Sequence, residues 1–322
     1  MSSVCDFLFS ADMLVPKPRE AIEQMIETIG LRRPGPRAYV DYEHSGWDCV
    51  FALVNPAWEV GPTRLEVIGP KQYADTPQLS RAQLISGVQG AKPCKTHATV
   101  IATPRMDELV AHVRRLGLRH WLEEGSGETP FPRLWMGIED EGFVYQPDAD
   151  AGLIIEVLPS DSAAFTPKLF LTPPPVPVDP VPGQMVRILS RAYLVDDIEA
   201  TVRVLGRNLL WEAEGEVIDD DEAGYRRVIM SRNHKQGAAL KLLQPLREAT
   251  ALGEYYRQWG GGAYAIRIAV HDLVARREQL HSAGTQFVDL PPTATEPARV
   301  CVDPAATARM PFEFVEFGEA EA

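Results

Sequence analysis

The sequence has few cysteines, and their spacing matches neither a disulfide framework nor a metal-binding cluster. Only four occur in 322 residues, at positions far apart along the chain: Cys5, Cys49, Cys94 and Cys301. Small secreted domains that depend on disulfides are much richer in cysteine, and structural zinc sites use closely spaced pairs. We therefore expect four reduced thiols in a cytoplasmic protein.

Long apolar runs and positive charge are also scarce. No stretch is apolar over a length that would cross a bilayer, and the N-terminus has no signal-peptide pattern. The chain has 32 lysines and arginines against 45 aspartates and glutamates, a net charge of -13. This acidity argues against nucleic acid and anionic membranes as partners. The length predicts a soluble globular protein of two or more domains.

Residues 94–156 set a pattern that the rest of the chain repeats. They contain a strand-like stretch, an amphipathic helix and several short strand-like runs. Strict alternation in the first stretch predicts that His97 shares one face with Thr99 and Ile101. Glu156 lies among apolar residues in the last stretch, where a carboxylate is costly unless it is paired or binds a metal. We therefore expect His97 and Glu156 to meet on one concave face.

Four units with this order of elements follow one another. The first strands are expected at 6–18, 94–104, 188–197 and 263–272, and the last at 64–70, 153–159, 239–245 and 312–318. In three units a proline turn precedes the last strand, ten or eleven residues before Glu66, Glu156 or Glu313. Self-similarity of this kind indicates a repeated structural module.

Prolines divide these units into two pairs. Six of them fall within ten residues: Pro173, Pro174, Pro175, Pro177, Pro180 and Pro182. Their density excludes a helix or a central strand and predicts an extended linker. We place the linker at 173–184, between an N-terminal half, 1–172, and a C-terminal half, 185–322.

The repeated order of strand, helix and three strands resembles the vicinal oxygen chelate superfamily. That group includes glyoxalase I, methylmalonyl-CoA epimerase, fosfomycin-resistance enzymes, bleomycin-binding proteins and extradiol dioxygenases. The resemblance covers nearly all of the chain, and four tandem units resemble the extradiol dioxygenase arrangement. It implies an α+β fold in which four βαβββ modules pair into two cup-shaped halves of mixed β-sheet, with metal ligands in first and last strands.

In the N-terminal half, the family's ligand positions fall on residues that suit a metal. The resemblance places the ion on Glu66, His97 and Glu156, with Ser10 where a fourth ligand often lies. Asp12, two residues further along the strand, is expected to face the same way and to act with Glu156 in catalysis.

These assignments have structural alternatives. Either glutamate would be satisfied by Arg64 or another basic group, or by solvent at a sheet edge. Asp12 alternatively belongs to a turn or to the rim of the cup.

In the C-terminal half the same positions fall on Ser190, Lys241, Ala265 and Glu313, which is not a metal-binding set. This differs from extradiol dioxygenases, whose iron normally sits in the C-terminal half on two histidines and one glutamate. We expect this half to be free of metal, to shape the entrance, and to be closed by a Lys241–Glu313 salt bridge.

One imidazole and two carboxylates suit Zn, Mn, Co, Ni or Fe(II). One such ion can bind two neighbouring substrate oxygens and stabilise an enolate-like oxyanion while a carboxylate moves a proton. The prediction is therefore a metal-dependent lyase or isomerase for a small oxygenated substrate. An extradiol-type ring-cleaving dioxygenase using Fe(II) is one alternative.

A metal-free protein that sequesters an aromatic or drug-like molecule is another alternative. Several aromatic residues would suit the lining of its cup: Trp47, Trp58, Trp135 and Tyr145. Core packing explains them equally well. No nucleic-acid or membrane partner is expected, and a homodimer is left open.

Overall fold

The structure is a computed structural model of the 322-residue chain. It describes residues 4–5, 7–42, 47–55, 63–71, 85, 87, 89–125, 131–138, 144–160, 181–230 and 237–318. Residues 173–180 of the predicted linker and Trp58 lie outside the described residues. The division into two domains stays a prediction.

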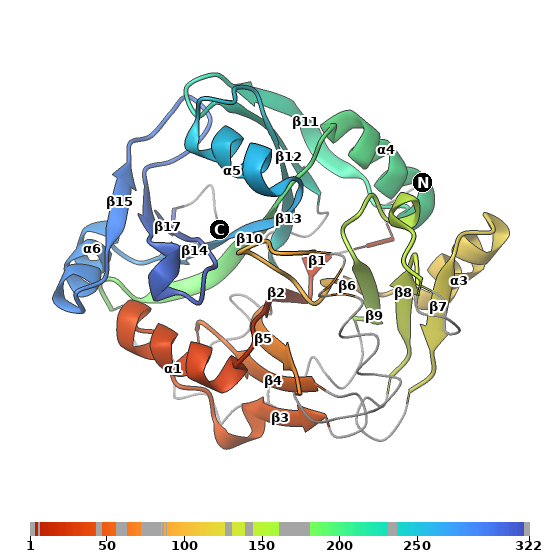
Figure 1. Ribbon diagram of the computed structural model, residues 1–322, viewed down its shortest axis with the longest axis horizontal. Helices are drawn as coiled ribbons and strands as arrows, with labels where there is room; N and C mark the ends of the chain where they lie inside the picture. Colours follow the sequence, from red (N-terminus) through yellow and green to blue (C-terminus); the bar gives the residue numbers. More distant parts are fainter. Residues whose placement is uncertain are drawn as a thin grey trace.

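The N-terminal half contains two βαβββ modules (Figure 1). The first consists of β1 (Phe7–Leu8), β2 (Ser10–Leu14), α1 (Pro18–Ile29), β3 (Tyr39–Tyr42), β4 (Trp47–Ala52) and β5 (Arg64–Pro70). The second consists of β6 (Thr99–Thr103), α3 (Met106–Arg115), β7 (His120–Glu123), β8 (Arg133–Met136) and β9 (Ile155–Pro159). Strands β1 and β2 together take the place of one first strand that is broken at Phe9.

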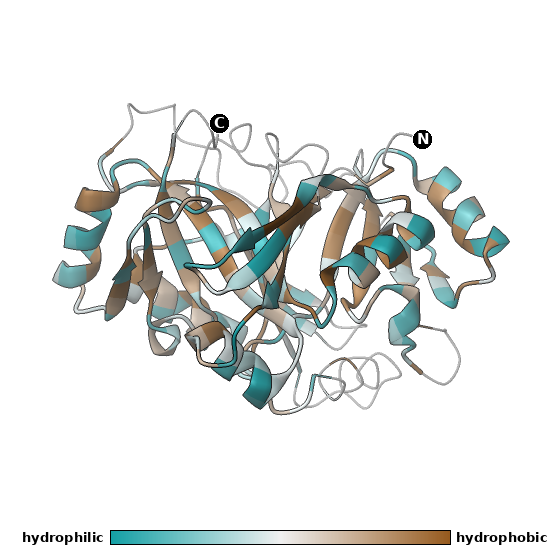
Figure 2. Ribbon diagram, turned by 90° about the horizontal axis from the view of Figure 1, so that it is seen from above, coloured by the Kyte–Doolittle hydropathy of each residue, from teal (hydrophilic) through white to brown (hydrophobic). Residues whose placement is uncertain are grey.

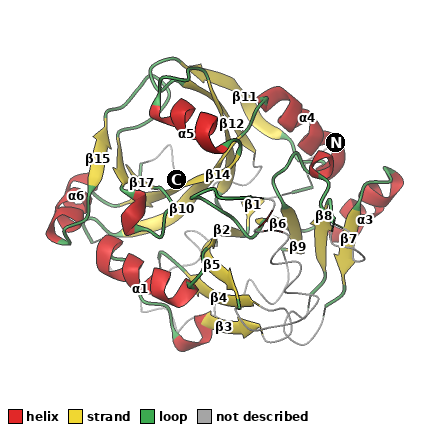
Figure 3. Ribbon diagram, in the orientation of Figure 1, coloured by secondary structure: helices red, strands yellow, loops and turns green. Residues whose placement is uncertain are grey.

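The C-terminal half repeats this order (Figure 3). The third module consists of β10 (Met185–Leu194), α4 (Ile198–Leu209), β11 (Ala213–Asp220), β12 (Tyr225–Met230) and β13 (Ala239–Pro245). The fourth consists of β14 (Gly262–Val270), α6 (Leu273–Ser282), β15 (Phe287–Leu290), β16 (Arg299–Val302) and β17 (Phe312–Glu316). Helix α5 (Ala251–Trp259) connects the two modules.

The first and last strands of every module pair in parallel. These pairs are β2–β5, β6–β9, β10–β13 and β14–β17. In the C-terminal half, antiparallel pairing of β10 with β14 joins both modules into one eight-stranded sheet. In the N-terminal half, β1 pairs with β6 while β2 pairs with β5, so the broken first strand takes part in two sheets. The predicted α+β fold of four βαβββ modules in two cup-shaped halves of mixed sheet is confirmed.

The helices lie on the outside and bury one apolar face against the strands. In α4, Ile198, Leu205 and Leu209 are buried, and the Asp197 side chain caps the helix by accepting a hydrogen bond from the Ala200 amide. Figure 2 shows hydrophobic residues concentrated on the inner strands and hydrophilic residues along the helices at the periphery. The strands therefore lie on the inside of the molecule, where they line the cups.

The two halves share one hydrophobic core. Its buried residues come from all four modules. Helix α3 lies against α4, where the His112 ring nitrogen Nε2 is 2.8 Å from the Arg207 carbonyl oxygen. Helix α1 lies against α6, where the Arg276 guanidinium donates a hydrogen bond to the Ile29 carbonyl oxygen. The first module therefore packs on the fourth and the second on the third.

All four cysteines are free. Within the described residues, no helix combines the length and the apolar character needed to span a membrane.

Glycine at position 69 is required where β5 approaches the chain that follows β2. A Cβ atom on Gly69 would lie 2.1 Å from the Val15 carbonyl oxygen. We expect Gly69→Ala to lower the free energy of unfolding by about 1–3 kcal/mol, measured by chemical denaturation. The control is Gly206→Ala inside α4, where the nearest atom would be 3.8 Å away and alanine favours the helix. Equal stability of Gly69→Ala and the wild type would contradict this close approach.

Candidate metal centre in the N-terminal cup

Three potential metal ligands converge between the first and second modules. Asp12 in β2 lies opposite Glu66 in β5, so both side chains leave the sheet on the same face. His97 reaches the same place from the bend before β6, with its Nδ1 3.3 Å from Asp12 Oδ2. The ligand atoms of all three lie within 4.8 Å of one another, and all three residues are buried.

The prediction that His97 shares a face of the strand with Thr99 and Ile101 is wrong. The His97 ring contacts Trp47 and Trp135, which belong to the apolar cluster inside the N-terminal cup. Ile101 instead packs into the core shared by both halves, and the Thr99 hydroxyl donates a 2.7 Å hydrogen bond to a backbone carbonyl oxygen. The reason is that β6 begins at Thr99, so the alternation of an extended strand does not reach back to His97.

Two tryptophans hold the imidazole ring. The Trp47 and His97 ring centroids are 4.9 Å apart at 79°, and those of His97 and Trp135 are 5.4 Å apart at 87°. Edge-to-face contacts on two sides restrict ring rotation. The Tyr145 hydroxyl, by contrast, donates a 2.6 Å hydrogen bond to Asp150. Trp47 and Trp135 are thus the predicted aromatic residues that flank the site.

Ser10 lies between the two carboxylates. Its hydroxyl oxygen is 2.9 Å from Glu66 Oε2 and also within hydrogen-bond reach of Asp12 Oδ1. The Cys49 thiol donates to Glu66 Oε1 at 3.6 Å. A serine hydroxyl carries one hydrogen, so Ser10 satisfies only one carboxylate at a time. The other carboxylate requires a proton or a cation to offset its buried negative charge.

Burial raises the pKa of both carboxyl groups to about 7. The nearby charge of Asp12 raises the pKa of Glu66 further, whereas the Ser10 hydroxyl and the charge of Arg191 oppose the shift of Asp12. In the part of the chain that the structure describes, neither Asp12 nor Glu66 forms an ion pair with lysine or arginine. Two buried carboxylates and an imidazole without such a counter-charge fit a divalent metal ion.

Glu156 lies beside this group rather than within it. Its carboxylate is 3.7 Å from the Arg133 guanidinium. A basic group therefore pairs with Glu156, as the structural alternative proposed, but the sequence did not indicate which one. Burial raises the pKa of Glu156 to about 7, while the charges of Arg133 and His97 oppose the shift. Arg64, the partner named as an alternative, stacks its guanidinium over the Phe9 ring at 4.1 Å, and its charge opposes the rise in the pKa of Glu66. The place of Glu156 among the ligands stays a prediction.

The C-terminal cup pairs its charges differently from the prediction. The expected Lys241–Glu313 salt bridge is wrong: Lys241 forms an ion pair with Glu296, and Glu313 pairs with Arg267 at 2.7 Å. Glu296 comes from the loop between β15 and β16. No repeated pattern marks that loop, so the sequence offered no signal for this partner.

Comparisons with known proteins bear on the fold. No protein-family model and no curated protein matches the chain. A mutant of 4-hydroxymandelate synthase from Streptomyces coelicolor is 12% identical over 96% of this chain and 92% of that chain, with a TM-score of 0.57. Methylmalonyl-CoA epimerase from Mycobacterium tuberculosis is 17% identical over 45% of this chain and 95% of that chain, with a TM-score of 0.39. The similarity to the synthase concerns the fold, which is the predicted vicinal oxygen chelate fold.

Without divalent ions, the free energy of unfolding is expected to fall as pH rises from about 5 to about 8. The pKa values of Asp12, Glu66 and Glu156 are raised to about 7 in the folded protein. The folded protein therefore binds more protons than the unfolded chain in this range, and that stabilisation is lost as they dissociate.

Thermal unfolding in EDTA across this pH range measures the effect. Glu66→Gln removes one titrating group and should flatten the profile. Asp150, another buried carboxyl group with a pKa raised to about 7, is present in both proteins and cancels in the comparison. A Glu66→Gln profile as steep as that of the wild type would contradict the assignment.

Proposed function

We propose that Asp12, Glu66 and His97 hold one divalent metal ion in the N-terminal cup. We further propose that the protein is a metal-dependent lyase or isomerase for a small substrate with neighbouring oxygen atoms. The observation that carries the proposal is the convergence of these three buried side chains from β2, β5 and the bend before β6. This assignment moves Asp12 from the predicted role of base into the ligand set.

The ligand set suits Zn, Mn, Co, Ni or Fe(II). When bound, such an ion would act as a Lewis acid and stabilise negative charge on substrate oxygens. Trp47 and Trp135 fix the orientation of His97 and keep water from its ring. Ser10 and Cys49 donate hydrogen bonds to the Glu66 carboxylate and orient it.

Glu156 is the proposed proton-moving group. It is buried on the strand next to β6, close enough to His97 for their charges to interact. A carboxyl group with a pKa of about 7 divides its time between both protonation states near neutral pH, as a general acid or base requires. The 3.7 Å separation from Arg133 leaves this carboxylate only loosely paired.

His97→Ala should weaken binding of a divalent ion while leaving the fold intact. Loss of a residue that hydrogen-bonds a metal ligand lowers the affinity for the metal by about 10–100-fold. Loss of a ligand itself should lower it by at least as much. Calorimetric titration of EDTA-treated protein with Zn, Mn, Co, Ni and Fe(II) measures the change. His271→Ala, which removes a histidine outside the N-terminal cup, is the matched control. Metal binding that His97→Ala leaves unaltered would refute the proposed centre. A wild-type protein that binds none of these ions would favour the metal-free binding protein.

Glu156→Gln should retain the metal and lose proton transfer. General acid–base catalysis contributes about 10²–10⁴-fold to a rate, so a loss of this order is expected. Exchange of substrate α-protons with D₂O, followed by NMR across a panel of 2-hydroxyketones and dicarbonyl acids, reports the step directly. Full exchange activity in Glu156→Gln would exclude this residue as the acid or base. Loss of metal together with activity would instead make it a ligand, as the sequence alone predicted.

A further inference from the structure

The C-terminal cup contains a pocket of about 620 Å³. Its walls are largely apolar and aromatic, and include Tyr225, Leu243, Leu252, Tyr264 and Pro291. Helix α5 contributes one side, and the loop after β15 contributes another. A pocket of this size and lining suits a small organic molecule.

Three charged residues of this pocket, Lys241, Arg267 and Glu313, lie on first and last strands, as Asp12 and Glu66 do in the other cup, and two of the three are cations. Arg267 lies opposite Glu313 in the parallel pair β14–β17, as Asp12 lies opposite Glu66 in β2–β5. Lys241 takes the last-strand position in the third module. The same architecture therefore places Arg267 and Lys241 where the N-terminal cup places carboxylates, while Glu313 keeps a carboxylate at the position of Glu66.

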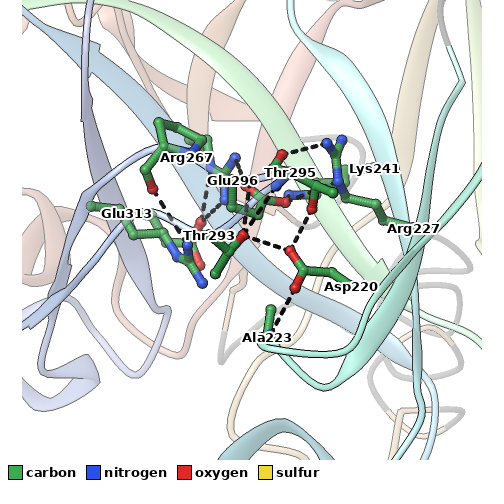
Figure 4. Close-up of polar contacts among 11 residues, drawn as sticks. Asp220, Ala223, Arg227, Lys241, Arg267, Thr293, Thr295, Glu296 and Glu313 are labelled. Atoms are coloured by element: carbon green, nitrogen blue, oxygen red, sulfur yellow. Dashed lines mark hydrogen bonds and ion pairs between the residues drawn. The ribbon is translucent and has the colours of Figure 1, made fainter.

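One buried carboxylate neutralises part of this charge (Figure 4). Glu296 forms ion pairs with Arg267 at 2.6 Å, with Arg227 at 3.2 Å and with Lys241. Its own loop is secured by a 2.6 Å hydrogen bond from Arg227 to the Thr295 carbonyl oxygen. Glu296 is thus shared among three cations.

Arg299 has no directly paired counter-charge: its charge lowers the pKa of Glu313, but the two residues form no ion pair. Arg299 lines the pocket and is buried, with only 6% of its surface exposed to solvent. Its Nε atom has no hydrogen-bond partner. Its polar contacts are a 3.5 Å hydrogen bond to the Pro297 carbonyl oxygen and an interaction with the Cys301 thiol. Among the described residues, no carboxylate lies within ion-pair distance of it. A buried guanidinium without a directly paired anion is costly.

The charge balance leaves room for one anion. Arg227, Lys241, Arg267 and Arg299 face Glu296 and Glu313, so four cations meet two carboxylates. A third buried carboxylate, from Asp220, accepts hydrogen bonds from neighbouring threonines and an amide. Among these buried groups, one positive charge remains in excess when Lys241 is protonated. Glu222, which also lines the pocket, is exposed. Burial and the charge of Arg267 lower the pKa of Lys241 to about 7, as expected where positive charge is concentrated.

We propose that this pocket binds a small organic carboxylate with an apolar or aromatic body. The carboxylate would accept hydrogen bonds from Arg299 and Lys241, and the body would lie among Tyr225, Tyr264 and Leu252. Glu313 does not oppose this binding, because Arg267 already donates to its Oε2 from Nε at 2.9 Å and from Nη2 at 2.7 Å. The proposal extends the expectation that this cup only shapes the entrance, and it does not depend on the metal centre.

Charge selectivity of the full-length protein tests the proposal first. Benzoate and phenylacetate should bind saturably in calorimetric titration and raise the unfolding temperature. Benzyl alcohol and benzylamine, of similar shape but neutral or positive, should bind at least about tenfold more weakly. The titrations are carried out in EDTA, so that binding at the proposed metal centre does not contribute.

Arg299→Met tests the site itself. It should weaken benzoate binding by about tenfold or more. It should also raise the unfolding temperature of the ligand-free protein, because a buried charge without an ion-pair partner is removed. A purely structural arginine would give the opposite shift in temperature. Arg247→Met, which removes an exposed arginine that pairs with Asp221, is the matched control and should leave benzoate binding unchanged. Arg299→Lys keeps the charge and should retain part of the binding.

Several results would overturn the proposal. Benzylamine binding as tightly as benzoate would show that the pocket does not select an anion. If inorganic phosphate bound as tightly as either carboxylate, the proposed contribution of an apolar or aromatic body to binding would be refuted. No binding of either carboxylate, or benzoate binding that Arg299→Met leaves unchanged, would refute the site.

Discussion

The parallel register between the first and last strands of each module determines which residues meet on the floor of each cup. Residues opposite one another in such a pair face the same side of the sheet. The register brings Asp12 beside Glu66 and Arg267 beside Glu313. A shift of one residue in either pair would turn these side chains to the other face of the sheet, where the hydrophobic core lies. The chemistry of both cups therefore depends on strand register.

Charge at these positions distinguishes the two cups. In the N-terminal cup, two carboxylates and an imidazole come together, and burial raises the pKa of both carboxyl groups to about 7. In the C-terminal cup, cations come together, and the buried loop residue Glu296 balances only some of them. Buried like charges are costly unless an opposite charge compensates them. One fold thus supports two kinds of site, one suited to a cation and the other to an anion.

Packing between the halves affects the N-terminal site directly. Arg191, on β10 of the third module, is buried, and its charge opposes the rise in the pKa of Asp12. The Tyr193 hydroxyl on the same strand is 2.6 Å from the hydroxyl of Thr99, two residues after His97. The C-terminal half therefore contributes to the electrostatics and to the support of the site in the N-terminal half.

The sequence by itself determined the repeated modules and most of the residues near the candidate metal centre. Recurring strands, helices and glutamates reveal the modules because period and spacing follow from local geometry. Glu66, His97 and Asp12 were recognisable from their places in that repeat. Tertiary structure alone decided the details that depend on irregular backbone and on contacts distant in sequence. The bend before β6 turns His97 away from the face of Thr99, and it places the imidazole against Asp12. Arg133 meets Glu156, and Glu296 reaches Lys241, because separate strands and a loop converge in space. No local pattern encodes such meetings, since they arise only when the sheets curve around the cups.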